Sequence, residues 1–322
     1  MEYRELGRTG WKISTIGLGT WAMGSSWGPV DDNESMATLN RALDLGVNFF
    51  DTADIYGSEH LLRRLRRERS EPFYVATKMG RKSTPGGEGL TRANITKFTE
   101  DSLRDLGIDT IDLMQLHSLP IDVYNPEVFG VLDDLVAQGK IRHYGVSVER
   151  IVEAEKAMEF PNVQSVMIVF NMFRQRPAEA FLGEAARRGV GVLARVPLAS
   201  GLLTGKMSRS TTFAPDDHRS YNRNGESFDK GETFSGVDFE TGLRAVEELR
   251  PLVRPNTTMA QMALRWVLMF DAVTSTIPGA RRPSQAEANV AAADLPPLSD
   301  ATMEAVRDVY ERHIRPQLDS RW

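Results

Sequence analysis

Short apolar runs alternate with helical patterns along the chain, and this alternation constrains the fold more than any other feature. The candidate strands cover residues 16–20, 47–51, 73–78, 111–116, 144–148, 163–170, 190–194 and 273–277. Near-continuous apolar strands separated by helices are typical of a parallel α/β sheet. Eight such units favour a closed (β/α)₈ TIM barrel over an open sheet. We expect one barrel domain over residues 1–322, because no linker or low-complexity tract interrupts the pattern.

Two segments lie outside this repeat. Residues 3–6 and 11–13 flank a turn containing Gly7, Thr9 and Gly10, which predicts an N-terminal β-hairpin. After the seventh strand, residues 207–242 are polar and rich in Ser, Asp, Gly and Asn, before a helical stripe that begins at Met259. A long loop there is either a disordered insertion or a flap on the active-site face of the barrel, and the sequence allows both.

Composition excludes several classes of function. The chain has 322 residues, a formal net charge of −5 and no cysteine. Nucleic-acid binding needs a basic face, and the basic run at 63–69 is expected to be a solvated helix surface. Without cysteine there is no disulfide, thiolate catalysis or cysteine-ligated zinc. No signal peptide and no apolar stretch of about 18 residues is visible, so we expect a cytoplasmic protein that does not enter membranes.

Polar residues occupy the ends of three successive candidate strands. Asp51, Lys78 and His117 end the second, third and fourth strands, and Tyr56 lies in the loop after Asp51. The carboxyl ends of barrel strands meet at one rim, so these four side chains are expected to face one site. Each residue alone has an ordinary alternative, such as a helix cap for Asp51 or a surface position for Lys78.

These residue types suit acid–base chemistry at a carbonyl group. Reduction by hydride needs a proton donor, and the tyrosine pKa of about 10 is high for that task. A neighbouring lysine cation lowers this pKa, an aspartate keeps the lysine charged, and a histidine can orient the substrate oxygen. The clustered His and carboxylate spacing of a metal site is not present in the sequence.

At these residues the chain resembles the aldo-keto reductase family, over nearly its whole length. The motifs lie at 48–57 (NFFDTADIYG), 76–78 (ATK), 113–117 (LMQLH), 145–147 (GVS), 201–206 (GLLTGK) and 277–281 (IPGAR). The resemblance implies that Tyr56 is the general acid in reduction and the general base in oxidation. It implies that Lys78 and Asp51 tune Tyr56, and that His117 orients the carbonyl. NADPH or NADP⁺ is then expected across the barrel rim, without a Rossmann domain.

The resemblance also implies cofactor contacts. Ser147 and Gln164 match residues that hold the nicotinamide carboxamide, and Arg195 replaces a tyrosine that stacks on the nicotinamide in many members. Arg281 matches a residue of the 2′-phosphate site and favours NADPH. The other matches are Thr20, Trp21, Leu202, Gly205, Lys206, Gly279, Gln285 and Asn289. Of these, the last two share a face of a predicted helix, whose free backbone N–H groups suit a phosphate.

Two positions depart from the family pattern. Val148 stands where members often have an asparagine beside the serine, which removes one polar contact to the cofactor. The tyrosine loop, residues 56–60, is shorter than usual, which changes the loop beside the pocket.

Three functions are compatible with the sequence. The leading hypothesis is an NADPH-dependent reductase of an aldehyde or ketone, reversible toward the alcohol. The second is a regulatory subunit that binds NADPH with little or no turnover, since some related barrels modulate membrane channels. The third is an aldolase-type enzyme with a Schiff base on Lys78, which leaves Tyr56, His117 and Arg281 without a role.

The small-molecule carbonyl substrate cannot be identified from the sequence. Candidate pocket residues are Trp21, Trp27, Leu119 and the tail to Trp322, although packing or surface roles explain them equally well. The oligomeric state is open, because no exposed apolar stripe or heptad pattern is found.

Overall fold

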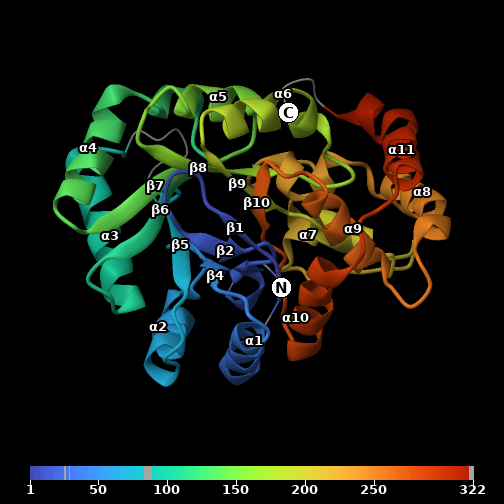
Figure 1. Cartoon of the computed structure of the whole chain (residues 1–322), viewed down its shortest axis with the longest axis horizontal. Helices are drawn as coiled ribbons and strands as arrows, with labels where there is room; N and C mark the ends of the chain where they lie inside the picture. The colour runs from blue at the N-terminus through green and yellow to red at the C-terminus, as the bar shows by residue number, and fades with distance from the viewer. Residues whose placement is uncertain (25–26, 29, 83–88, 319–322) are drawn as a thin grey trace.

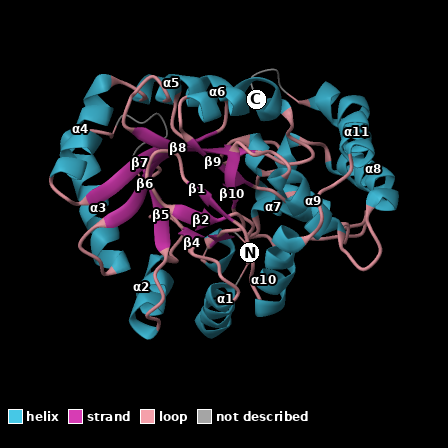
Figure 2. Cartoon of the chain, in the orientation of Figure 1, coloured by secondary structure: helices cyan, strands magenta, loops and turns pink. Residues whose placement is uncertain are grey.

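A computed structural model describes residues 1–24, 27–28, 30–82 and 89–318. Eight parallel strands pair in chain order. They are β3 (Leu18–Gly19), β4 (Phe49–Asp51), β5 (Tyr74–Met79), β6 (Ile111–His117), β7 (Ile141–Val148), β8 (Val163–Val169), β9 (Gly191–Arg195) and β10 (Val273–Thr276). Each overlaps one candidate strand from the sequence. Figure 2 shows the strands gathered in the middle of the molecule with helices around them.

Backbone contacts between the first and last strands close the sheet. Parallel bridges join Ile16 to Thr276 and Gly19 to Gly279. The amide of Gly17 donates to the carbonyl of Thr276 at 2.9 Å. The predicted (β/α)₈ barrel is therefore confirmed.

Helices separate successive strands and cover the outside of the sheet (Figure 1). They are α1 (Asp32–Asp44), α2 (Glu59–Glu68), α3 (Arg92–Leu106), α4 (Pro126–Ala137), α5 (Ile151–Ala157), α6 (Arg176–Arg187), α9 (Met259–Leu268) and α10 (Pro283–Val290). Beside them, α8 (Phe239–Leu249) packs against α11 (Asp300–Val309). Side-chain caps fix several helix starts; at α9, Thr258 Oγ1 accepts the Gln261 amide at 3.2 Å.

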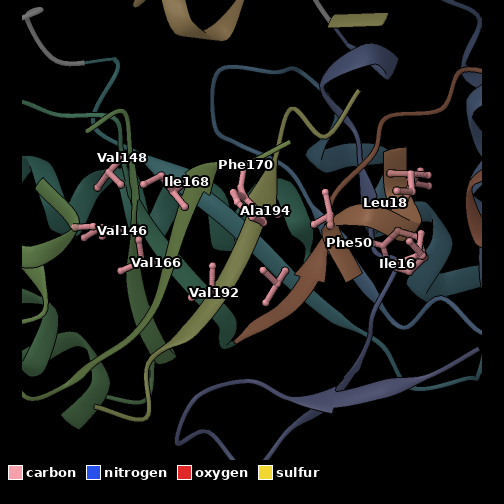
Figure 3. Packing of buried hydrophobic residues seen from close by; sticks show 14 of the residues in the cluster. Ile16, Leu18, Phe50, Val146, Val148, Val166, Ile168, Phe170, Val192 and Ala194 are labelled. Carbon is pink, nitrogen blue, oxygen red and sulfur yellow. The ribbon is translucent and has the colours of Figure 1, made fainter. Parts of the chain in front are cut away.

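Alternate residues of the strands face two separate cores, because successive side chains of a strand point to opposite faces. The inner core fills the barrel with Phe49, Ala76, Leu113, Met167, Leu193 and Ile277. The outer core lies between strands and helices, and the members labelled in Figure 3 include Val146, Val148, Val166, Ile168, Val192 and Ala194. A polar residue two positions beyond an inner-core residue, such as Asp51 after Phe49, therefore points into the barrel mouth.

The N-terminal hairpin closes the amino end of the barrel. Its strands are β1 (Tyr3–Glu5) and β2 (Lys12–Ser14), which pair antiparallel, so the predicted hairpin is confirmed. Leu6 and Ile13 belong to the inner core. Arg8 Nη2 donates to the carbonyls of Pro161 at 2.7 Å and Val163 at 3.0 Å, where β8 begins. The carboxyl end is thus left as the accessible mouth.

The long loop after β9 is a folded strap, which we define as residues 207–238. It contains α7 (His218–Tyr221) and 3₁₀ turns at Lys230–Glu232 and Phe234–Gly236. The helix α8 starts at Phe239, so the predicted loop boundary at 242 was too late. Of the two alternatives, the disordered insertion is wrong, because the strap has defined turns and buried residues.

Candidate active site

A cavity of about 400 Å³ lies at the carboxyl ends of the strands. Six of its lining residues are inward-facing positions near the ends of β4 to β9: Asp51, Lys78, His117, Ser147, Met167 and Arg195. Like the inner-core residues, they occupy the alternate strand positions whose side chains point into the barrel, and they therefore lie together at its mouth. The predicted meeting of Asp51, Tyr56, Lys78 and His117 at one rim is confirmed, since all four line this cavity.

Three contacts connect these four side chains in a row, from Asp51 through Lys78 and Tyr56 to His117. Lys78 Nζ donates to Asp51 Oδ1 at 2.6 Å and to the Thr52 carbonyl at 2.7 Å. The same nitrogen lies 4.9 Å from the centroid of the Tyr56 ring. The Tyr56 hydroxyl lies 3.4 Å from His117 Nε2. A carbonyl oxygen entering the cavity can therefore meet a phenol and an imidazole together.

Burial controls the ionisation of the group. It raises the pKa of Asp51 and lowers the pKa of Lys78, while the contact between the two opposes both shifts. Burial also lowers the pKa of His117 well below its ordinary value, and the nearby cations Arg81, Lys78 and Arg195 add to this effect. His117 is therefore a neutral imidazole at neutral pH.

The expected direction of the Tyr56 shift is wrong. The sequence predicts that Lys78 lowers the pKa of the phenol, but in the structure burial raises it. Asp51 and Glu232 add to the upward shift of the Tyr56 pKa, while Arg81 and Arg195 oppose it. The physical reason is that the cost of charging a buried phenol outweighs the effect of the nearby cations on the Tyr56 pKa. Tyr56 thus stays protonated at neutral pH.

The loop that carries Tyr56 is fixed by hydroxyl contacts and one close approach. Ser58 Oγ lies 3.0 Å from Thr52 Oγ1 and 2.8 Å from Thr20 Oγ1. A Cβ atom on Gly24 would lie 1.8 Å from the Tyr56 carbonyl oxygen, so only glycine fits there. The placement of Thr20 at the cofactor is a correction: its buried hydroxyl binds the Asp51 carbonyl at 3.0 Å and does not line the cavity.

Aromatic rings form one wall above the tyrosine. Trp21 is stacked on Tyr56 with 5.9 Å between ring centroids, and the strap adds His218 at 4.8 Å from Trp21. Trp27 lies 4.5 Å from His218. The expected pocket residues Trp21 and Trp27 line the cavity.

The other two candidate pocket residues do not enter this wall. Leu119 is buried against Gly80 outside the cavity lining. The tail residue Trp322 lies outside the described residues.

Sequence reasoning missed a network of four charged side chains beside Tyr56 and His117. Arg195 Nη2 donates to Glu149 Oε1 at 2.6 Å, and Arg195 Nη1 lies 3.7 Å from Glu232 Oε1. Arg81 pairs with Glu232, and its Nε donates to the His117 carbonyl at 3.4 Å. No short motif signals this network, because Glu232 comes from the strap.

The two carboxyl groups of this network differ in ionisation. Burial raises the pKa of Glu149 to about 8, although Arg195 opposes the shift. Burial also favours the neutral form of Glu232, but Arg81 and Arg195 outweigh it and lower the pKa of Glu232 to about 2. Glu232 is therefore the ionised carboxylate of the network at neutral pH.

Most of the expected cofactor residues lie at the cavity. Those that line it are Trp21, Ser147, Arg195, Lys206, Gly279, Arg281 and Gln285. Leu202 instead packs in the outer core, and Gly205 ends the 3₁₀ turn Ala199–Thr204 with a left-handed backbone. Asn289 reaches the site indirectly, since its Nδ2 donates to the Gly279 carbonyl at 3.2 Å.

The assignment of Gln164 is wrong. Gln164 is the second residue of β8, and it lies beside Tyr144 and Asn162 at the amino end of the barrel, away from the catalytic cavity. It shares that place with Val136 and Ala137 of α4, so it lies on the outer, helix-covered face of the sheet. The residue of β8 that lines the cavity is Met167, whose thioether is a weak acceptor and no donor.

The start of α10 differs from the expected phosphate site. The Gln285 Oε1 atom accepts the amides of Arg281 at 2.8 Å and Arg282 at 3.2 Å, so the expected free N–H groups already have a partner. The Arg281 guanidinium donates to the Trp27 carbonyl at 2.9 Å. Gln285 and Asn289 do share a face, since both reach residues just before α10.

Comparison with known proteins agrees with this geometry. Residues 15–311 match the model of the aldo/keto reductase family. Aldo-keto reductase YhdN of Bacillus subtilis is 33% identical, over 89% of this chain and 87% of its own. A probable voltage-gated potassium channel subunit beta of Arabidopsis thaliana is 30% identical, over 92% and 93%.

A solved structure is similar as well. The glycerol dehydrogenase AKR11B4 of Gluconobacter oxydans has a TM-score of 0.78 and 33% identity, covering 100% of this chain and 98% of its own. The chain belongs to the aldo/keto reductase family. It is an oxidoreductase of carbonyl compounds that uses a nicotinamide cofactor. Among the described residues, we find no helix long and apolar enough to cross a membrane.

Proposed function

We propose that the chain is a single-domain, NADPH-dependent reductase of aldehydes or ketones, with Tyr56 as the proton donor. The observation that carries the proposal is the 3.4 Å separation of the Tyr56 hydroxyl and His117 Nε2 in a cavity that also holds Lys78 and Asp51. Because Tyr56 is protonated and His117 neutral, one can donate a proton to the alkoxide while the other orients the carbonyl oxygen.

The residues present fit a phosphorylated dinucleotide. Besides Lys78 and Arg195, the cationic side chains of Lys206, Arg219 and Arg281 line the cavity, and these three suit the phosphate groups. A Cβ on Gly279 would make only ordinary van der Waals contact, with Ala22 at 3.7 Å, and Gly279 itself lines the cavity. Ser147 would contact the carboxamide, and Arg281 with Gln285 the 2′-phosphate. When bound, the nicotinamide supplies the hydride.

This chain's own residues handle the proton. Lys78, fixed by Asp51, holds a cation next to the Tyr56 ring and stabilises phenolate as it forms. The aromatic wall of Trp21 and Trp27 limits water at the phenol. In the reverse direction Tyr56 accepts the proton of the alcohol.

The direct test follows NADPH absorbance with purified protein and a reactive aromatic aldehyde, beside a fluorescence titration of NADPH. Turnover supports the proposal. Similarity to a probable channel subunit supports the second hypothesis, a regulatory subunit that binds NADPH. NADPH binding with no turnover over a broad carbonyl panel would favour that hypothesis. A Lys78 adduct trapped by borohydride would instead favour the Schiff-base enzyme.

A further inference from the structure

The strap delivers a carboxylate to the catalytic cavity. Of the strap residues, Met207, Arg219 and Glu232 line the cavity, and Glu232 is the acidic one. Its side chain is only 5% exposed and lies against Arg81 and Arg195. Arg195 itself lines the cavity, and Arg81 contacts the backbone of the catalytic His117. The ionisation of Glu232 therefore changes the electrostatic potential in the cavity beside His117 and Arg195.

The backbone around Glu232 is held in place. The Glu232 carbonyl accepts Ser200 Oγ at 3.0 Å, and the same oxygen atom of Ser200 accepts the Phe234 amide at 3.0 Å. Phe234 and Ser235 have positive φ values of 52° and 59°, a strained conformation that persists only where surroundings impose it. Asn171 Nδ2 donates to Ser235 Oγ at 2.8 Å. These contacts fix the position of the Glu232 carboxylate in the cavity wall.

The charge balance of Arg81 and Arg195 depends on Glu232. Arg81 and Arg195 face two carboxyl groups, Glu149 and Glu232, and Glu232 is the one held in its ionised form. A second pair of opposite charges, Arg174 and Asp229, lies beside Glu149. Removal of Glu232 would leave two guanidinium groups with Glu149 alone. With one carboxyl group left for two largely buried guanidinium groups, a carboxylate from outside would gain a favourable interaction there.

We propose that Glu232 is a specificity-determining residue, which offsets the charge of Arg81 and Arg195 and makes the enzyme select uncharged carbonyl compounds over those that carry a carboxylate. This inference rests on the proposed carbonyl reduction. Cations that already have carboxylate partners in the protein attract a substrate carboxylate less, and specificity is a difference between two affinities.

The test compares 4-formylbenzoate with its methyl ester, which share the reacting aldehyde and differ in charge. The measured quantity is kcat/KM for the acid divided by kcat/KM for the ester. In Glu232→Gln we expect this ratio to rise at least tenfold. In Glu232→Asp, which keeps the charge, it should stay within about threefold of the natural enzyme.

Glu149 needs a control, since it could ionise in place of Glu232. Glu149→Gln alone should change the ratio less than threefold, and the Glu149→Gln/Glu232→Gln double variant should raise it at least tenfold. An unchanged ratio in both Glu232→Gln and the double variant would overturn the inference, provided that the ester is still reduced. Failure of the natural enzyme to reduce the ester would instead count against the proposed function.

Discussion

The Nζ atom of Lys78 lies 2.6 Å from Oδ1 of Asp51, and both side chains are buried inside the barrel. The two residues come from the neighbouring strands β4 and β5. They meet because both side chains point into the barrel. The relationship serves two purposes. It keeps a cation next to the Tyr56 ring, and it compensates two charges that would each be costly to bury alone.

Replacing Lys78 with Met should therefore damage both activity and stability. We expect kcat for aldehyde reduction to fall by about 10²- to 10⁴-fold, since proton transfer loses its supporting charge. Urea unfolding should show a loss of about 3–5 kcal/mol, because Asp51 is left buried without a partner. The Lys78→Met/Asp51→Asn double variant should regain part of that stability and none of the activity. Equal stability of the single and double variants would contradict this reading.

Gly24 should be intolerant of a methyl group. In Gly24→Ala the new Cβ would meet the Tyr56 carbonyl oxygen at 1.8 Å, so the tyrosine loop must shift. We expect kcat/KM to fall at least tenfold while NADPH binding changes little. Gly130→Ala is the matched control: a Cβ there meets nothing within 4 Å in helix α4, and alanine should stabilise the helix by about 0.5–1 kcal/mol. Normal kcat/KM in Gly24→Ala would show that this contact does not position Tyr56.

The pH profile of reduction should lack a basic limb below about pH 9. Reduction uses the protonated phenol, and burial raises the pKa of Tyr56 above its ordinary value of about 10. The downward shift in the pKa of His117 likewise keeps the imidazole neutral above about pH 6.5. Burial also raises the pKa of Glu149, so any weaker alkaline dependence caused by Glu149 should disappear in Glu149→Gln. A tenfold fall per pH unit above pH 8 that persists in Glu149→Gln would contradict the Tyr56 assignment.

Arg281 should govern the choice between NADPH and NADH. In Arg281→Ala the dissociation constant for NADPH should rise by about 10- to 100-fold, the size expected for a charged hydrogen bond, while that for NADH stays nearly constant. Arg282→Ala is the control, since its guanidinium lies 3.4 Å from Glu34 and its side chain is 72% exposed. Fluorescence titration measures both. Equal weakening of the two cofactors would place the 2′-phosphate elsewhere.

The fold could be predicted because the apolar runs repeat and barrel strands are buried on both faces. The meeting of Asp51, Lys78 and His117 could be predicted for the same reason: they lie at or one residue before the ends of β4, β5 and β6, so topology brings them together. Strand parity could also have corrected one error. Met167 shares the inward parity of the inner core at the carboxyl end of β8, whereas Gln164 is at the wrong end and faces outward.

Other features had no local signal. Glu232 lies 151 residues from Arg81 in sequence, within an irregular strap that has no periodicity to predict its packing. The upward pKa shift of Tyr56 depends on burial and on Asp51 beside Lys78, which residue types alone do not reveal. Similarly, the capping of α10 by Gln285 became visible only from the geometry.

Single-turnover reduction with prebound NADPH tests the central claim most directly. The natural enzyme and Tyr56→Phe would each be saturated with NADPH and mixed with an aromatic aldehyde, and loss of NADPH absorbance would be followed. We expect Tyr56→Phe to react about 10²- to 10⁴-fold more slowly, with its NADPH dissociation constant within threefold of the natural enzyme. A rate within threefold of the natural enzyme would contradict the assignment of Tyr56 as the proton donor.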